Sequence, residues 1–461
     1  MSPHRLRHRS RGRPGTGGSY DPVVHTSPAG SPSHVATGLD VRPFRALTYR
    51  QRDPGHLARV SSPAYDLVTP DAAERLAAAD PHNIVRLILP GGTSGPGTAG
   101  ATSPAAAGDV ATRAARTLQE WEQDGVLVRD GQPAVWRYEM RPAAGDPTVG
   151  WLGAVAVSAA GGRAVLPHED TFPAAVEGRR ALLAATATDL EPIVLAHDPE
   201  PEVAELTAEA GAGRPDLEVV DADGVAHRLW RVTDPEALRR LGTALRRTGA
   251  VIADGHHRFA AAQALHRTHP DGDCRVLALL TPMGTGGLRL QAIHRVVPDL
   301  DLQEAGHAAA GGFTVAEVPL AAGGADVAAA AAELLPGLPD GFLLTDGQRL
   351  LRLSDATTRV RATVPAEAPP SWRGLDVVLA TTGLIGALWG RPDDPGSVLV
   401  AHDVAEAVRL AGTRAGVAVL LRPPSPADVA AVARAGARMP RKSTLFVPKP
   451  RTGLVLRPHA G

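Results

Sequence analysis

The chain has 461 residues, of which 44% are hydrophobic and 21% charged, and its formal net charge is −1. This composition is typical of a soluble globular protein with two or three domains. The first forty residues carry five arginines and two aspartates, so a net charge of −4 remains on the rest of the chain. Because non-specific affinity for nucleic acid comes from neutralised phosphates, the body of the protein is not expected to bind nucleic acid.

The single cysteine, Cys274, excludes a disulfide within the chain and favours a reducing compartment. Its strand-like surroundings predict a buried, inert thiol. The apolar runs are much shorter than the roughly 20 residues that span a bilayer, and the N-terminus lacks the apolar segment of a secretory signal. We therefore expect a cytoplasmic protein that does not bind membranes.

The chain begins with a segment, residues 1–39, that is rich in Arg, Gly, Pro, Ser and His and predicts a disordered tail. The Gly-rich run 91–100 predicts a flexible loop, without the Gly-Lys-Ser/Thr of a phosphate-binding loop. Hydrophobic periodicity predicts these elements in chain order: helix 71–80, strand 83–89, helix 111–123, strands 134–138 and 151–157, helix 325–335, strands 342–353 and 359–364, a linker at 365–370, two amphipathic helices, and strands 444–447 and 454–456.

Strands that alternate with helices predict a mixed α/β (α+β) fold. We expect three parts, which are the tail 1–39, a core at 40–300 with insertions, and a C-terminal α/β domain at 301–461.

The most informative stretch is 248–262, where an apolar run ends at Asp254-Gly255, followed by His256, His257 and Arg258 and an alanine-rich helical pattern. This predicts a strand, a turn and a helix start, where free N–H groups and the helix dipole favour an anion. We expect a phosphate there, with Asp254 as N-cap, metal ligand or acid/base. Zinc binding by the two histidines is disfavoured, because neighbouring side chains point in different directions.

A second candidate is Leu166 to Thr171, which places His168 and Glu169 behind a strand. Glu169 is a candidate general base or magnesium ligand, and His168 a phosphate contact, although a plain polar loop remains an alternative. Arg179 and Arg180 follow on a helical pattern, as a phosphate fork or a solvated face.

Asp66 lies in a turn, where it is either catalytic or a turn-stabilising carboxylate. His294 and Arg295 are polar residues within an apolar strand and are candidate phosphate contacts.

The only two lysines, Lys442 and Lys449, lie within eight residues of each other, in a chain that otherwise uses arginine. Lysine in a chain that otherwise uses arginine suggests a functional site that needs a compact ammonium group, although chance clustering of the two lysines is an alternative. Residues 436–444 resemble the P-loop motif, but Arg441 occupies the position of its second glycine. The residues that follow also predict a strand, whereas a P-loop leads into a helix. Lys442, Ser443 and Thr444 remain candidate phosphate contacts.

Eight short motifs occur in order: Val-Arg-Pro-Phe-Arg-Ala-Leu (41–47), Ser-Pro-Ala-Tyr-Asp (62–66), Pro-His-Asn-Ile-Val-Arg-Leu (81–87), Trp-Glu-Gln-Asp-Gly-Val-Leu (121–127), His-Glu-Asp-Thr (168–171), Ala-Asp-Gly-His-His-Arg-Phe (253–259), His-Arg-Val-Val (294–297) and Met-Pro-Arg-Lys-Ser-Thr (439–444). This set resembles the bacterial and archaeal domain of unknown function 1015 family across residues 40–458. The chain departs from that family's pattern at Ala64, where proline is usual, and at Ala380, where a histidine is expected.

The turn at 254–258 also resembles the second signature box of the ParB/sulfiredoxin superfamily, which binds nucleotide phosphates through a Gly-x-x-Arg turn. The resemblance implies a ParB/sulfiredoxin-like core. Sulfiredoxin has a cysteine where this chain has His256, and no helix-turn-helix is evident, so the free serine kinase is the member most similar in this turn.

These residues predict a phosphoryl-transfer enzyme, of kinase or phosphatase type, that uses a nucleotide (ADP or ATP) and a small hydroxylated metabolite. The resemblance to the free serine kinase implies serine or phosphoserine as the first substrate to consider. Gly255 to Arg258 would hold phosphate and Lys442 would neutralise charge. The candidates for base and Mg²⁺ ligand are Asp254, Glu169 and Asp66, with Mg²⁺ expected at Asp254 and Glu169. A CTP-type nucleotide sensor without turnover and DNA association through the arginine tail remain alternatives.

Overall fold

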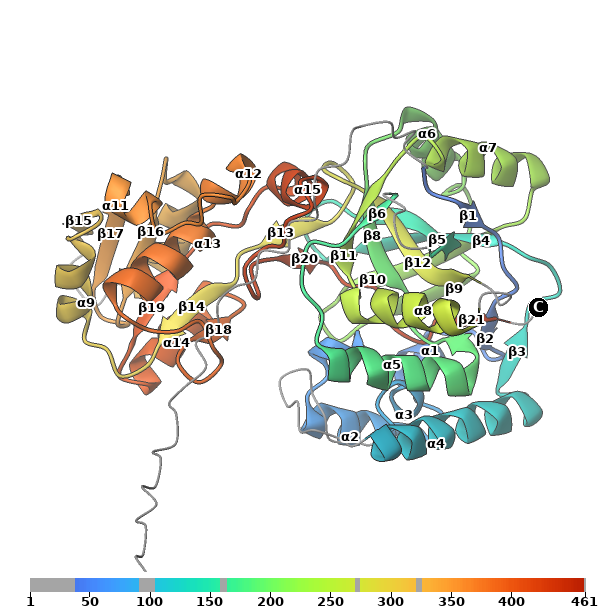
Figure 1. Cartoon of the computed structure of the whole chain (residues 1–461). Helices are drawn as coiled ribbons and strands as arrows, with labels where there is room; N and C mark the ends of the chain where they lie inside the picture. Colours follow the sequence, from blue (N-terminus) through green and yellow to red (C-terminus); the bar gives the residue numbers. More distant parts are fainter. Residues whose placement is uncertain (1–37, 91–103, 158–163, 270–273, 321–325, 460–461) are drawn as a thin grey trace, which may run out of the picture.

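The computed structural model describes residues 38–90, 104–157, 164–269, 274–320 and 326–459. Two lobes are visible in Figure 1, one built on a large mixed sheet and one on a smaller antiparallel sheet. The chain is therefore a mixed α/β protein, as its sequence predicts. The expected tail at 1–39, apart from its last two residues, and the Gly-rich run 91–100 lie outside the described residues.

The first lobe contains a nine-stranded sheet, ordered β6-β11-β8-β12-β5-β4-β10-β9 with β1 paired to β5. Only the pairs β6–β11 and β8–β12 are parallel among the described pairings of this sheet. Its strands are β1 (Val41–Arg42), β4 (Val135–Arg141), β5 (Thr148–Ala156), β6 (Val165–Leu166), β8 (Ile193–His197), β9 (Leu217–Val220), β10 (Ala226–Val232), β11 (Ala250–Asp254) and β12 (Arg275–Pro282).

Both faces of this sheet are buried, because alternate residues of each central strand enter different apolar clusters. Ile193 and Leu195 of β8 belong to one cluster, and Val194 and Ala196 to the other. Helix α5 packs against both α4 and α8, and Figure 1 shows α5 lying between these two helices. The helices of this lobe are α1 (Pro54–Val60), η1 (Tyr65–Leu67), α2 (Pro70–Ala79), α3 (Val85–Ile88), α4 (Pro104–Gln123), α5 (Pro173–Thr186), α6 (Pro201–Glu209), α7 (Pro235–Leu245) and α8 (His256–Thr268).

The second lobe contains a six-stranded antiparallel sheet, ordered β15-β17-β16-β19-β14-β18. Its strands are β14 (His294–Val297), β15 (Thr314–Glu317), β16 (Phe342–Thr345), β17 (Leu350–Ser354), β18 (Leu399–Ala401) and β19 (Val417–Leu420). Its helices are α9 (Leu302–Ala309), α10 (Val327–Leu334), η2 (Leu335–Gly337), α11 (Thr358–Arg361), α12 (Pro370–Arg373), α13 (Asp376–Val378), the π-helical η3 (Leu379–Leu388), α14 (Val404–Thr413) and α15 (Pro426–Arg434).

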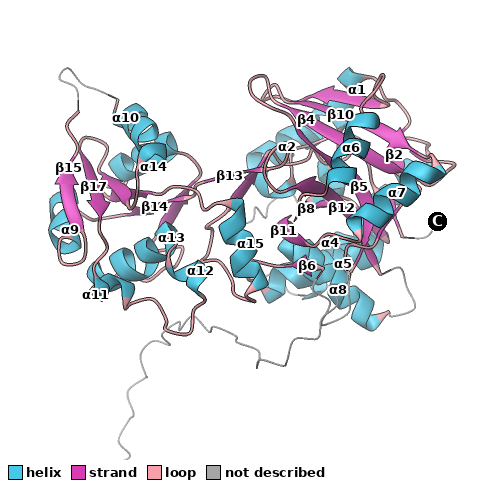
Figure 2. Ribbon diagram, turned by 90° about the horizontal axis from the view of Figure 1, so that it is seen from above, coloured by secondary structure: helices cyan, strands magenta, loops and turns pink. Residues whose placement is uncertain are grey.

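The chain enters the second lobe and then returns to the first. The strands β13 (Arg289–Gln291) and β20 (Leu445–Val447) pair as an antiparallel ribbon that lies between the lobes in Figures 1 and 2. Beyond β20, β21 (Arg457–Pro458) pairs with β7 (Thr188–Asp189) of the first lobe. A further ribbon there joins β2 (Leu47–Tyr49) to β3 (Leu127–Arg129). The first lobe therefore contains both early and late segments of the chain, and the boundary expected at 300 stays a prediction.

Three predicted strands are wrong in the structure. Residues 83–89 form the short helix α3, because Asn83 accepts a hydrogen bond from Val85 N at 2.9 Å and so starts a helical turn. Residues 359–364 begin with α11, which Thr357 caps through Val360 N. Residues 454–456 form no regular strand, although Leu456 bridges Leu47.

The return segment is fastened by a buried ion pair. Arg457 Nη1 lies 2.6 Å from Asp189 Oδ2, and both side chains are almost fully buried. The same carboxylate accepts from Leu277 N at 2.9 Å. Removing one member would leave an uncompensated buried charge.

We expect Arg457→Ala to lower the free energy of unfolding by about 3–5 kcal/mol, because Asp189 then stays buried without its closest cation and keeps only His459 at 3.4 Å and the N–H of Leu277 as partners. Urea unfolding of the full chain measures this change. The control is Arg239→Ala, which removes an exposed ion pair with Glu236 and should leave the unfolding midpoint near that of the wild type. Equal midpoints for the two variants would contradict the fastening role of Arg457.

Candidate functional site

The predicted strand, turn and helix start is formed by β11 and α8, with Gly255 at φ +94° as the N-cap. A side-chain carbon on Gly255 would lie 2.8 Å from Ile193 Cγ2, so glycine is required by both conformation and space. No side chain caps the helix, so the expectation that Asp254 is the N-cap is wrong. The N–H groups of His256, His257 and Arg258 consequently have no partner within the helix.

Asp254 instead takes part in a buried ion-pair group. Lys449 Nζ contacts Asp66 and lies 2.7 Å from Asp254 Oδ1, with the lysine side chain almost completely buried. Burial alone would raise the pKa of Asp254, but Lys449 and Arg258 lower it below its ordinary value. Burial alone would lower the pKa of Lys449, and the two carboxylates raise it. Asp254 and Lys449 are therefore both charged at neutral pH.

Arg258 is engaged by neighbouring protein groups. Its Nη2 donates to Asp254 Oδ2 at 2.5 Å and its Nη1 to the carbonyl of Pro192 at 2.6 Å. Its Nε is buried and has no hydrogen-bond partner in the described structure, and it lies 3.2 Å from the position of a Cβ on Gly255. One donor of Arg258 thus remains beside the helix start, while both of its Nη atoms are bound by the protein.

Tyr65 and Arg179 lie beside this group. The Arg179 guanidinium carbon is 3.8 Å from the centroid of the Tyr65 ring, and Nη1 donates to the carbonyl of Ile88 at 3.2 Å. Glu191 Oε1 accepts from Tyr65 N at 3.1 Å and from Thr452 Oγ1 at 3.0 Å. These contacts connect the segment of Asp66 to the segment of Lys449.

On the other side of the helix start, a hydrogen-bonded chain joins His168, Thr444 and Glu169. His168 Nε2 is 2.9 Å from Thr444 Oγ1, which donates to Glu169 Oε1 at 3.1 Å. Because a carboxylate only accepts, the hydroxyl proton of Thr444 points to Glu169, and His168 Nε2 carries the proton that Thr444 accepts. The chain thus ends on the Glu169 carboxylate.

The two adjacent histidines have different partners. His256 Nε2 accepts from His168 N at 3.3 Å, and the two rings meet edge to face at 4.6 Å. His257 Nε2 accepts from Phe172 N at 3.1 Å, which leaves its proton on Nδ1 when the ring is neutral. Burial, with the neighbouring His256, lowers the pKa of His168 to about 3. Burial likewise lowers the pKa of His256 to about 3.

Some predicted site residues lie elsewhere or have supporting contacts. His294 is in β14 of the second lobe, where its Nδ1 accepts from Leu421 N at 3.1 Å. Arg295 is fully buried, and its Nη1 and Nη2 donate to the carbonyls of Lys442 at 2.9 Å and Arg441 at 2.7 Å. It therefore holds the turn that leads to Thr444.

The two remaining candidates of this turn differ in exposure. Lys442 is exposed, with φ +51°, and its charge lowers the pKa of His257 after the larger effect of burial. Ser443 is buried and donates to the carbonyl of Pro440 at 2.6 Å. Lys442 is therefore near the helix start with its ammonium open to solvent.

The carboxylates expected to bind magnesium, Asp254 and Glu169, are not arranged as a metal site. Within the described ranges, no three His, Cys, Asp or Glu residues are grouped as a metal site requires. Asp254 already has Lys449 on one oxygen and Arg258 on the other. Asp254 and Glu169 as arranged do not fit a resident Mg²⁺, which is held by free carboxylates and by substrate phosphates.

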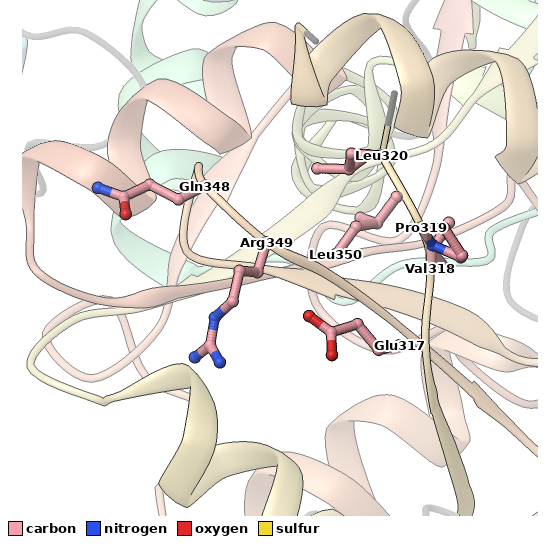
Figure 3. Close-up of a pocket in the computed structure, with 7 residues that line it drawn as sticks. All are labelled: Glu317, Val318, Pro319, Leu320, Gln348, Arg349 and Leu350. Atoms are coloured by element: carbon pink, nitrogen blue, oxygen red, sulfur yellow. The ribbon is translucent and has the colours of Figure 1, made fainter. Parts of the chain in front are cut away.

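A separate pocket opens beside β15 and β17 of the second lobe. It is lined by Glu317, Val318, Pro319, Leu320, Gln348, Arg349 and Leu350 (Figure 3). None of the predicted site residues lines it.

Among the described helices, none combines the length and the apolar character needed to cross a membrane.

Sequence reasoning missed Lys449, Tyr65, Glu191 and Thr452 as members of the site. The scarcity of lysine pointed to the segment that contains Lys449, but the sequence alone could not show which of Lys442 and Lys449 contacts Asp254. Nothing in the local sequence distinguishes Glu191 from other acidic residues.

A family model described as "Protein of unknown function (DUF1015)" matches residues 41–378. The chain belongs to the DUF1015 family. The match confirms the resemblance inferred from the motifs and ends before residues 439–444, where the last of those motifs lies. No curated protein matches the chain.

Several solved structures are distantly similar to the present chain. A free serine kinase variant in complex with AMP has 13% sequence identity and a TM-score of 0.33, and the match covers 68% of this chain and 95% of the kinase. SbnI from Staphylococcus aureus, truncated at its C-terminus, has 14% identity and a TM-score of 0.33 over 67% and 88% of the two chains. A conserved hypothetical protein from Pyrococcus furiosus has 14% identity and a TM-score of 0.30 over 62% and 87%. At these TM-scores the likeness says nothing about what the present chain binds.

The two buried neutral histidines predict acid sensitivity. In the unfolded chain a histidine takes up a proton near its ordinary pKa of 6.5, whereas His168 and His256 in the folded protein stay neutral down to about pH 3. Between these values the unfolded state binds more protons, so stability falls as the pH falls, by about 1.4 kcal/mol per pH unit for each ring.

We expect His256→Gln to lose one ring's share of this slope while keeping a side-chain acceptor for His168 N. Urea unfolding between pH 7.5 and 4.5 measures the slope of each protein. A variant with the wild-type slope would show that His256 is not held neutral.

Proposed function

We propose that this protein is a nucleotide-dependent phosphoryl-transfer enzyme that acts on a small hydroxylated or phosphorylated metabolite, with serine and phosphoserine as the first substrates to test. The observation that carries the proposal is the uncapped start of α8, which lies between two groups of opposite character. One is the ion-paired group of Asp66, Lys449 and Asp254, and the other is the hydrogen-bonded chain from the neutral ring of His168 through Thr444 to the Glu169 carboxylate.

The phosphate is placed at the helix start. The N–H groups of residues 256–258 and the positive end of the dipole of α8 attract an anion. The Nδ1–H of neutral His257, the Nε–H of Arg258 and the exposed ammonium of Lys442 supply further donors. Preorganised donors of this kind stabilise charge on a transferring phosphoryl group.

Glu169 is the proposed general base. In the forward direction, the metabolite's hydroxyl oxygen forms a bond to the terminal phosphorus, and the bond from that phosphorus to the bridging oxygen breaks. The hydroxyl proton passes to Glu169, and the shortened nucleotide leaves with the electron pair on its terminal phosphate. Thr444 holds Oε1, so the other carboxylate oxygen is the one that accepts the proton.

Lys449 is a positioning residue in this proposal. It holds Asp66 and Asp254 together and, with Arg258, balances their charge, so that an incoming phosphate does not meet two unpaired carboxylates. The nucleotide would carry its own Mg²⁺ on its phosphates, as part of the substrate. We also propose that the first lobe is a ParB/sulfiredoxin-like core, on the strength of the turn at 254–258.

The test is turnover of Mg-ATP or Mg-ADP with serine, and of phosphoserine alone, by the full chain and by Glu169→Gln. We expect the variant to lower kcat by about 10² to 10⁴, because the base is removed while the phosphate contacts remain. Nucleotide affinity, measured by calorimetry, should be unchanged. The matched control is Glu177→Gln on α5, whose carboxylate pairs with Arg180, and both readouts should stay at wild-type values.

Two outcomes would overturn the proposal. Absence of nucleotide binding by the wild-type chain would contradict a phosphate site at α8. Tight binding without turnover of any small hydroxylated acid would contradict phosphoryl transfer and favour a nucleotide-sensing protein.

A further inference from the structure

Phe172 is the most exposed large hydrophobic side chain among the described residues, with 61% of its surface accessible. It precedes Pro173 at the start of α5, so it belongs to the loop that also supplies His168 and Glu169. An aromatic ring left in water forgoes the free energy that its burial would provide. Its position at the edge of the proposed site therefore needs a reason.

The ring is held in a defined orientation. Its plane is tilted by only 15° from that of the His257 ring, with 5.9 Å between the centroids, in a stacked arrangement. The backbone N–H of Phe172 donates to His257 Nε2 at 3.1 Å, which fixes the loop to the first turn of α8. A flat apolar surface is thus presented beside the residue whose backbone faces the phosphate position.

A second exposed apolar side chain lies on a neighbouring segment. Leu67, 55% exposed, ends the short helix η1, which also contains Tyr65 and Asp66. Tyr65 packs under Arg179 of α5, the helix that Phe172 begins. Apolar surface is therefore exposed on both segments that flank α5, next to the charged groups of the site.

We propose that Phe172 is the stacking platform for the nucleobase of the nucleotide whose phosphates bind at the start of α8. The inference rests on the proposed function, since it assigns the base end of the same ligand. In a nucleotide one ribose separates the base from its phosphate, and here the imidazole of His257 separates the Phe172 ring from the N–H groups of the helix. Every nucleobase has a π face, and stacking on an aromatic ring is favourable without sequence-specific hydrogen bonds.

The test compares the affinity of the full chain for ADP and for inorganic pyrophosphate, which has the phosphates but no base. We expect Phe172→Ala to bind ADP about tenfold more weakly, in line with the cost of losing one base–aromatic stack. Its affinity for pyrophosphate should be unchanged. Phe172→Trp should restore ADP binding, and its indole fluorescence should be quenched as ADP is added.

Phe172→Leu separates stacking from simple apolar cover, because leucine covers His257 without an aromatic face. We expect it to behave as Phe172→Ala does toward ADP. Val220→Ala, at another exposed apolar position on β9, is the control and should bind both ligands as the wild type does.

The outcomes separate this inference from the proposed function. Wild-type ADP affinity in Phe172→Ala or in Phe172→Leu would overturn the stacking role and leave the phosphate site intact. Equal weakening of ADP and pyrophosphate binding would also overturn it, since the ring would then act by shaping the helix start. Failure of the wild-type chain to bind either ligand would contradict the proposed function itself.

Discussion

The ammonium of Lys449 between Asp66 and Asp254 is the interaction on which the candidate site depends. It joins three segments that are far apart in the sequence, and it does so where little water can screen the charges. Removing either the ammonium or the carboxylates would leave the opposite charge buried without compensation. The neighbouring residues strengthen the same junction, because Arg451 contacts Ser61 and Thr452 pairs with Ser62.

This junction explains the path of the chain. Because Lys449 lies beyond the second lobe in the sequence and must reach Asp254 in the first, the chain has to return through β20. Thr444 directly precedes β20, so the position of the hydroxyl that holds Glu169 depends on how the ribbon between the lobes is placed. The second lobe thus contributes to the site through the strand that leaves it.

The sequence predicted the local part of this structure and missed the part that depends on distant contacts. The strand, turn and helix at 248–262 follow from hydrophobic pattern and from Gly255, which are local properties. The strand expected at 83–89 contains a helix because Asn83 starts a helical turn, and the carbonyls of Arg59 and Ser61, on an earlier segment, hold the side chain of Asn83 in place. Aspartate is a common N-cap residue, but Asp254 pairs instead with the ammonium of Lys449, which lies 195 residues later in the chain. This charge-assisted hydrogen bond is stronger than the hydrogen bond that an N-cap would make to a backbone N–H.

The charges at the helix start are arranged so that an anion meets a nearly neutral surface with oriented donors. Asp66 and Asp254 are balanced by Lys449 and Arg258, and the buried His168 and His256 rings carry no charge at neutral pH. The remaining attraction comes from the uncapped N–H groups of α8 and from the exposed Lys442. Donors that are fixed in place before a ligand arrives need little reorganisation, which is what stabilisation of a developing phosphoryl charge requires. The same fixed frame gives the exposed ring of Phe172 a defined distance from the phosphate position, so that a ligand must match both ends at once.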